Sequence, residues 1–248
     1  IPIPEGNFWS GCNDDVNAPN FSDYSEWCPQ TLVNVGAYCI YETPVTACQY
    51  EACVIAGDCA YTGGAPGYAT TYAGAGAERH PITEVNWAQA KTYCESRGDR
   101  LCTGFEWEKA GRGGCEAVTG DCKANTPKFP WGHLNGVAGM LGDFACTHAN
   151  FNFCMSSTSG SQEPFYWMTS PVDAFPAGDS VYGIKDLVGN AGEWTSDTSL
   201  DWEGNPAATV KSMGFSGSAQ QMSLERESLV PLGTLEFQIG FRCCGDLP

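Results

Sequence analysis

The pattern of apolar and polar positions predicts two helices near the middle of the chain. Residues 87–98 read WAQAKTYCESRG, a helical run that Asn86 is placed to cap and that Gly98 ends. Thr103 begins the second helix, because Glu106 follows three residues later and completes a capping box. That helix continues through the run FEWEKAGRG. We therefore expect two consecutive helices with a short connection between them.

Short strands are predicted on either side of these helices. Residues 33–46 have the composition and alternation of a strand, broken by a proline, and residues 235–243 also alternate. The first third of the chain, residues 1–79, is rich in cysteine, glycine and aromatic residues, so we expect short strands and loops there. Residues 113–182 show no period; long irregular stretches in compact domains tend to be functional, disordered, or pinned by crosslinks and ions.

Composition places these elements in one folded, acidic domain. The 248 residues contain no internal repeat and no clear linker, so we expect a single domain over residues 1–248. The net charge of −17 repels nucleic-acid phosphates and suits hard cations such as calcium where carboxylates converge. No run of about 18 apolar residues is present, and we expect no membrane-spanning helix.

Fourteen cysteines indicate a disulfide-rich protein from an oxidising compartment. A zinc site is disfavoured, because the chain has no C-x-x-C pair and only three histidines, His80, His133 and His148. Three short intervals between cysteines invite local bridges: Cys53 to Cys59, Cys115 to Cys122 and Cys146 to Cys154.

Five phrases, in order along the chain, resemble the formylglycine-generating enzymes, also called sulfatase-modifying factors. They are IPEGNFWSGC, YETPVTACQYEAC, HPITEVNWAQAKTYCESRGDRLCTGFEWEKAGRGG, SPVDAFP with YGIKDLVGNAGEWTSD, and IGFRC. The resemblance covers nearly the whole chain. It implies an α+β fold, an elaborated C-type-lectin-like domain with two main helices, short antiparallel strands, long ordered loops and many disulfides.

The resemblance also implies a disulfide between Cys94 and Cys243. Cys102 and Cys244 lie close by in the same layout, and we hypothesise a second, parallel bridge between them. Each bridge would close a loop of over a hundred residues, which stabilises the fold by about 4–5 kcal/mol in the chain-entropy model.

The residues that carry catalysis in the resembling enzymes are absent. Those enzymes use two nearby cysteines, before the closing GFR, to bind Cu(I) and to attack oxygen and a substrate cysteine. Here the interval contains no cysteine, and Ser218 and a position near Met222 or Ser223 stand where the thiols would be. A hydroxyl does not hold Cu(I), which prefers soft sulfur ligands. We therefore expect no formylglycine chemistry.

Other catalytic arrangements are weaker. The run GFSGS around Ser216 is similar to a nucleophile elbow but lacks its last glycine. Glu84, Glu106 and Glu108 lie in matched motifs and offer carboxylate pairs for acid–base work. For Glu106 and Glu108 a place in a capped helix is the simpler interpretation.

A calcium site is implied by the loop that begins at Asp186. In the resembling family this loop binds Ca²⁺ through a side chain at its first position, two backbone carbonyls and a final glutamate. The matching positions are Asp186, Gly189, Ala191 and Glu193. Mixed carboxylate and carbonyl oxygens are the ligands that calcium prefers.

A second calcium site of the family is matched only in its first half, by Asn150 and Phe151. In the second half Pro164 falls where an aspartate is expected, and Glu163 is the residue that would compensate.

We therefore expect a non-catalytic extracellular domain, rigidified by calcium and disulfides, that binds a protein or glycan at the cell surface or is a subunit of a larger assembly. The expected location is secreted, extracellular or periplasmic, and the source bacterial, because relatives with this many cysteines and a GFRCC ending resemble bacterial surface proteins. Trp87, Trp107 and Trp194 are predicted core residues, whereas Tyr166, Trp167 and Trp202 are candidates for exposed contact.

Two alternatives stay open. One is a divergent oxidase or modifying enzyme of the same family with a rearranged site. The other is a receptor whose ligand specificity varies through the segment SAQQMSLERES, just before the final strand.

Overall fold

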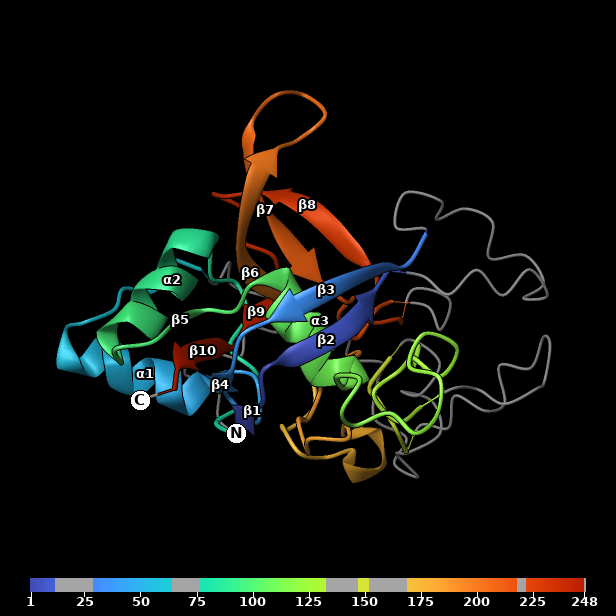
Figure 1. Ribbon diagram of the computed structural model, residues 1–248. Helices are drawn as coiled ribbons and strands as arrows, with labels where there is room; N and C mark the ends of the chain where they lie inside the picture. Colours follow the sequence, from blue (N-terminus) through green and yellow to red (C-terminus); the bar gives the residue numbers. More distant parts are fainter. Residues whose placement is uncertain (12–28, 64–75, 133–146, 152–168, 218–221, 248) are drawn as a thin grey trace.

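A computed structural model describes residues 1–11, 29–63, 76–132, 147–151, 169–217 and 222–247, and the account below concerns these residues. They form three α-helices and ten short strands joined by long ordered segments (Figure 1). None of the helices in this part of the chain is long and apolar enough to cross a membrane.

Each helix begins at a complete capping box. The two predicted helices are α2, Trp87–Ser96, capped by Asn86 with Gln89, and α3, Gly104–Arg112, capped by Thr103 with Glu106. The third helix, α1, spans Ala47–Ala56 inside the region expected to hold only strands and loops. It starts at Thr46, whose side chain accepts from the backbone of Gln49. The same local device therefore fixes the start of all three helices.

One four-stranded sheet contains both the first and the last strand of the chain. Its strands are β1 (Pro2–Ile3), β4 (Tyr38–Ile40), β10 (Cys243–Asp246) and β5 (Arg100–Leu101), in that order and all antiparallel. The predicted strand over residues 33–46 is therefore shorter and divided, because β3 (Thr31–Val35) belongs to a different sheet. Helices α1 and α2 lie on the same side of the molecule as β10 (Figure 1).

The other strands form a ribbon and a four-stranded sheet. The ribbon pairs β2 (Gly6–Ser10) with β3 and runs across α3 (Figure 1). The sheet has the order β8 (Glu227–Pro231), β7 (Pro206–Lys211), β6 (Gly192–Leu200), β9 (Ile239–Phe241). The pair β6–β9 is parallel, which departs from the expected all-antiparallel arrangement. The predicted strand over residues 235–243 begins only at Ile239.

Four disulfides crosslink the described residues, as is typical of proteins from oxidising compartments. The long-range bridges Cys94–Cys243 and Cys102–Cys244 are both present, as are the local bridges Cys53–Cys59 and Cys115–Cys122. The proposed pair Cys146 and Cys154 lies outside the described residues.

Candidate functional site

Helix α3 buries charged side chains, because it runs beneath the β2–β3 ribbon and beside the β6–β7–β8 strands. Glu108, Lys109 and Arg112 are all almost fully buried. Lys109 Nζ donates to the carbonyl of Pro4 at 2.5 Å, which ties the helix to the N-terminal strand. Buried charges persist only when they are paired or hydrogen-bonded, and this helix meets that condition.

Glu108 is the centre of a buried ionic network. Arg112 Nε donates to Glu108 Oε1 at 2.7 Å, and Lys211 Nζ donates to Glu108 Oε2 at 3.2 Å. Arg112 also donates to Glu225 Oε2 at 2.9 Å. Burial alone would raise the pKa of Glu108, but Lys211 and Arg112 outweigh it and hold that pKa below its usual range. The carboxylate is therefore ionised in the folded protein at neutral pH.

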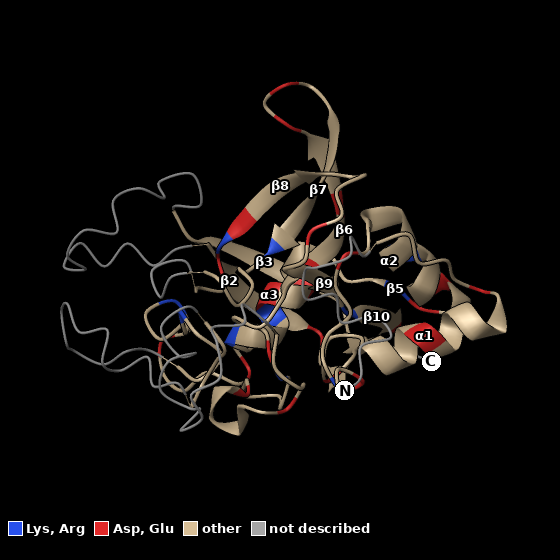
Figure 2. Cartoon of the chain, turned by 180° about the vertical axis from the view of Figure 1, so that it is seen from behind, with Lys and Arg blue, Asp and Glu red and all other residues tan. Residues whose placement is uncertain are grey.

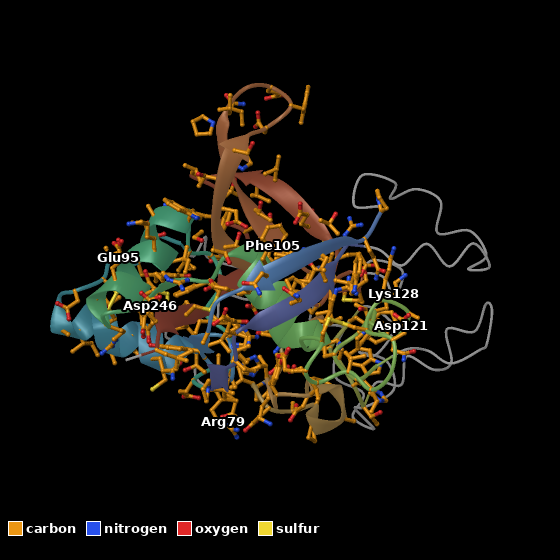
Figure 3. All side chains as sticks on the ribbon, viewed as in Figure 1. Arg79, Glu95, Phe105, Asp121, Lys128 and Asp246 are labelled. Carbon is orange, nitrogen blue, oxygen red and sulfur yellow. A yellow bond between two sulfur atoms is a disulfide. The ribbon has the colours of Figure 1, made fainter. Side chains whose placement is uncertain are left out.

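This network forms one wall of a cleft of about 460 Å³. The cleft lies between the β2–β3 ribbon, the start of α3 and the β7–β8 strands. Its charged lining comprises Glu108, Asp197, Lys211, Glu225 and Glu227, and the remaining lining residues include Ser10, Thr31, Phe105 and Thr209. Phe105 projects from the first turn of α3 between β3 and β7 (Figure 3). Residues distant in sequence thus meet in one cavity.

Gly104, the first residue of α3, holds the Asp197 carboxylate at the cleft. Its amide donates to Asp197 Oδ2 at 2.8 Å, and a Cβ at this position would lie 2.8 Å from that oxygen and 3.9 Å from Lys211 Cδ. A side chain at this position would therefore push the Asp197 carboxylate away from the amide that it accepts from. Lys211 also forms an ion pair with Glu227 at 3.5 Å across the β7–β8 register.

The segment where the resembling enzymes have thiols packs against α3. Met222 is fully buried in the same apolar cluster as Trp107 and Leu224, and Ser223 is buried as well. A Cβ at Gly111 would lie 2.4 Å from Leu224 Cδ2, so this close packing depends on the glycine. Ser218 lies outside the described residues.

The predicted calcium loop is buried and has an unusual backbone. Asp186 (φ 53°), Gly189 (φ 79°) and Asn190 (φ 59°) all adopt the left-handed region. A Cβ on Gly189 would lie 2.4 Å from the carbonyl oxygen of Asn150, so only glycine fits that turn. Burial raises the pKa of Asp186 to about 6, which indicates a carboxylate with incomplete charge compensation.

The two acidic members of this loop have different partners. Among the described residues, Asp186 Oδ2 accepts from the backbone amide of Asp173 at 3.0 Å, and Oδ1 accepts from Asn190 Nδ2 at 3.5 Å. Glu193, in contrast, receives two hydrogen bonds of 2.7 Å from Arg242 and one of 2.8 Å from Trp107 Nε1. The buried, weakly compensated Asp186 fits a cation ligand, whereas Glu193 already has a counter-ion.

Asn150 and Phe151, the matched half of the second predicted calcium site, lie against the loop of the first predicted site. Asn150 and Phe151 are both buried, and the amide of Asn190 donates to the carbonyl of Asn150 at 2.9 Å. The expected completing residues, Glu163 and Pro164, lie outside the described residues. No cluster of three or more histidine, cysteine or acidic side chains with metal-binding geometry occurs in the described part of the chain.

A family model, described as the sulfatase-modifying factor enzyme 1-like domain, matches residues 1–247. The chain belongs to this family. Its α+β, disulfide-rich fold is the one that the resemblance implied.

Two curated relatives of this family share about a third of their aligned residues with the chain. Formylglycine-generating enzyme from Mus musculus is 36% identical over 118 residues, which cover 48% of this chain and 27% of that protein. Inactive C-alpha-formylglycine-generating enzyme 2 from Bos taurus is 34% identical over 116 residues, covering 47% of this chain and 32% of that protein. The matched region therefore spans about a third or less of each relative.

A solved structure agrees with the fold over the full length. PvdO from Pseudomonas aeruginosa superposes with a TM-score of 0.71 at 20% identity, covering 100% of this chain and 94% of that one. This likeness concerns the fold alone.

Several predicted residues have structural roles. Trp107 and Trp194 are core residues as predicted, and Trp87 is half-buried and donates to the carbonyl of Thr195 at 2.8 Å. Glu106 closes its capping box and pairs with Arg100 at 2.7 Å. Trp202 is 91% exposed, as predicted. Tyr166, Trp167 and His133 lie outside the described residues.

Sequence reasoning missed most of the cleft. Lys211 lay in no motif, Glu225 and Glu227 were named only within the segment SAQQMSLERES, and Phe105 was included only as part of a helix. One signal was available: Lys211 ends the otherwise apolar run AATV of β7, and a lysine in that position must find buried partners.

Proposed function

We propose that this family member is a non-catalytic binding domain whose ligand occupies the cleft between the β2–β3 ribbon and the β7–β8 strands. The absence of thiols carries the proposal. The segment between Lys211 and Arg242 contains no cysteine, and Met222 contributes its side chain to the core instead. The segment therefore lacks the pair of thiolates with which the resembling enzymes bind Cu(I).

The free thiols of the described residues are not placed to replace the missing pair. Among the described cysteines, Cys39 and Cys48 are free, the first on β4 and the second exposed on α1. Neither lines the cleft. A relative that is itself named as inactive also supports a role for this scaffold without catalysis.

The loop from Asp186 to Glu193 is the proposed calcium site. Asp186 supplies a buried carboxylate, and the carbonyls of Gly189 and Ala191 are the further ligands that the family resemblance assigns. Bound calcium would offset the desolvation of Asp186 and stiffen the turn. Asn150 and Phe151 are proposed as part of a second site on the adjoining segment.

We place this domain outside the cell or in the periplasm of a bacterium, as a secreted or surface-attached protein. Its disulfides favour such a compartment. The proposed partner is a protein or a glycan at the cell surface, and the domain serves alone or as a subunit of a larger assembly. A nucleic-acid partner is disfavoured by the net charge of −17.

The experiment that tests this proposal measures metal content and turnover on the same preparation. After dialysis against metal-free buffer, mass spectrometry is expected to find calcium near one or two per chain and neither copper nor iron. A cysteine-containing peptide incubated with the protein, copper and oxygen is expected to keep its mass. Stoichiometric copper or iron, or conversion of the peptide to formylglycine, would overturn the proposal.

A divergent modifying enzyme is the second candidate. It is favoured by the buried Glu108 in the wall of the cleft, whose pKa its cationic partners lower, because ionisable groups with shifted pKa values in cavities commonly mark active sites. Iron or copper retained through dialysis and lost together with an oxygen-consuming activity would support this candidate.

A further inference from the structure

We propose that the free edge of β8 binds an extended peptide as an additional strand of the sheet. This inference rests on the proposed function, since it names a polypeptide as the class of ligand and places it at the border of the same cleft. It is carried by the hydrogen-bond register of β8, which leaves backbone groups unpaired at that edge, and by exposed apolar side chains on the adjoining face.

Strand β8 is the outer strand of its sheet. In the order β8–β7–β6–β9 its partner among the described strands is β7, and Figure 1 shows it at the margin of the sheet. An outer strand presents a row of backbone N–H and C=O groups, which is a template for a further strand. Which groups of β8 face outward follows from the β7–β8 ladder.

Hydrogen bonds at both ends of this ladder fix its pattern. The Ser212 amide donates to the carbonyl of Arg226 at 3.1 Å, and the Leu232 amide donates to the carbonyl of Pro206 at 3.2 Å. The register between these two bonds is continuous. Hydrogen-bonded and non-hydrogen-bonded pairs alternate in an antiparallel ladder. Every even-numbered residue of β8 therefore bonds to β7, and every odd-numbered residue directs its backbone outward.

The outward-facing residues of β8 are Glu227, Leu229 and Pro231. Pro231 has no N–H, and its carbonyl accepts from the Thr234 amide at 3.0 Å. The N–H and C=O groups of Glu227 and Leu229 bond to no described residue. Another extended chain presents complementary groups at the same two-residue spacing, whereas a glycan has no such repeat.

The cleft face of β8 offers apolar contact to an added strand. Leu229 is paired with Thr209 in the ladder, so its side chain lies on the sheet face that lines the cleft, and it is 47% exposed. Phe105, 51% exposed, lines the same cleft from the first turn of α3 (Figure 3). Side chains alternate across a strand, so every second residue of the peptide would face this side. We expect apolar residues at those positions.

The charge of the chain favours a neutral or basic peptide over a second copy of this chain. Exposed edges also pair with identical edges, but each copy carries a net charge of −17. Glu227 lies on the edge itself, and its carboxylate already pairs with Lys211 at 3.5 Å. A basic residue beside Glu227 would therefore add little to the affinity, and that contribution should fall with added salt.

The test begins with a random library of phage-displayed peptides of about eight residues, selected on the whole chain. The best peptide is then synthesised in two forms, N-methylated at its odd-numbered or at its even-numbered residues. Each form lacks the N–H donors of one edge, and one edge alone faces β8. In calorimetric titration we expect one form to lose at least about tenfold in affinity and the other to bind like the parent peptide.

A variant of the protein tests the same contact from the other side. Leu229→Pro removes an outward amide and leaves the β7–β8 ladder intact, because proline is tolerated where the N–H faces away from the sheet. We expect it to weaken peptide binding at least about tenfold. Leu229→Val keeps the amide and an apolar side chain, so the difference between the two variants reports the amide. Slow hydrogen exchange at Ser228 and Val230 verifies that β8 stays paired with β7.

The inference is overturned if no peptide is enriched, if both N-methylated forms bind equally, or if Leu229→Pro binds fully with its ladder intact. Self-association that Leu229→Pro abolishes, measured by ultracentrifugation, would make a second copy the occupant and overturn the peptide assignment. Because binding is measured without turnover, these outcomes leave the proposed non-catalytic role intact. A change in the mass of the bound peptide would instead overturn that role while the docking edge stands.

Discussion

Two buried ion clusters lie close to α3, and they differ in what surrounds them. In the first, Arg242 meets Glu193 in two hydrogen bonds of 2.7 Å, and both side chains are almost completely buried. In the second, Glu108 shares Arg112 and Lys211 with Glu225 at the wall of a cleft. Charged positions of both signs accordingly meet around α3 in the centre of the molecule (Figure 2).

The comparison separates a structural ion pair from a site that can respond to a ligand. Arg242 also donates to the carbonyls of Tyr41, Glu42 and Lys185, so the first cluster joins three chain segments and has no free face. The second cluster is also balanced, because Arg112, Lys211 and the more exposed Lys128 pair with Glu108 and Glu225, but it opens onto a cleft. Ionic groups beside a cavity are within reach of a ligand, whereas the sealed pair provides rigidity.

The largest expected effect concerns the disulfides that anchor the sealed cluster. Arg242 is followed directly by Cys243 and Cys244, which bind Cys94 and Cys102. Because the two bridges close nearly the same loop, we expect removal of either pair by alanine to cost much less than removal of both. Losing both should lower the free energy of unfolding by about 5 kcal/mol or more. Denaturant unfolding of the three variants measures the difference.

The short bridge Cys115–Cys122 provides the control for this prediction. It closes a loop with a sequence separation of only 7, so its removal should cost about 2 kcal/mol. Single long-range variants that each lose as much as the fourfold variant would show that the bridges act as one unit and not as redundant loop closures.

The second-largest expected effect is the loss of stability when one cation is removed from either cluster. Arg242→Met leaves Glu193 buried without a counter-ion, and we expect it to lower stability by about 3–5 kcal/mol. Lys211→Met leaves Glu108 with Arg112 and should cost about 1–3 kcal/mol. Thermal and chemical unfolding of both variants would test the order, and an equal loss would contradict the distinction between a sealed and a shared pair.

Sequence signals and the family resemblance predicted two helices and four disulfides, but they did not predict the cleft. The Asn86 cap of α2 and the capping box of α3 followed from short motifs, and the bridges Cys94–Cys243 and Cys102–Cys244 followed from the family resemblance and its cysteine layout. Helix α1 was missed although it has the same box at Thr46, because its run ACQYEACVIA mixes strand-forming residues with cysteines. The box at Thr46 and Gly57 after the last turn were the local signals that could have identified this helix.

The cleft is a product of topology. Its lining comes from β2, β3, α3, β6, β7 and β8, with residues from Ser10 to Glu227. No short stretch of the sequence contains all of these residues. Lys211 can be recognised as a site residue only once the fold places its Nζ 3.2 Å from Glu108 Oε2. The calcium loop is the opposite case, since its candidate ligands lie within eight consecutive residues, and it stays a prediction that metal analysis can test.

A smaller effect is expected from pH between 5.5 and 7.5. It arises at His80, outside both ion clusters, because neither cluster contains a histidine. Burial lowers the pKa of His80, whose Nδ1 lies 2.9 Å from Thr169 Oγ1. The neutral ring is therefore favoured in the folded state. Stability from this residue is present above the unfolded pKa near 6.5 and is lost as the pH falls below it. Unfolding at pH 7.5 and 5.5 should show a smaller acid-induced loss in His80→Asn than in the original chain.

The smallest effect is expected at the loop that joins β6 and β7, the part of the molecule least involved in either cluster. This loop stands away from the body and carries acidic but no basic positions (Figures 1 and 2). Asp201 fixes its turn by accepting from the amides of Glu203 and Asn205 at 3.0 and 2.8 Å, while Trp202 remains 91% exposed.

Trp202→Ala should therefore change the free energy of unfolding by less than about 0.5 kcal/mol, since the turn is held by Asp201 and not by the indole. Asp201→Ala is the matched variant: it removes the acceptor of both amides and should destabilise the loop more than the loss of the larger side chain does. Amide hydrogen exchange at Glu203 and Asn205 reports the loop directly. Exchange that accelerates in Trp202→Ala but not in Asp201→Ala would mean that the ring, despite its exposure, orders the turn.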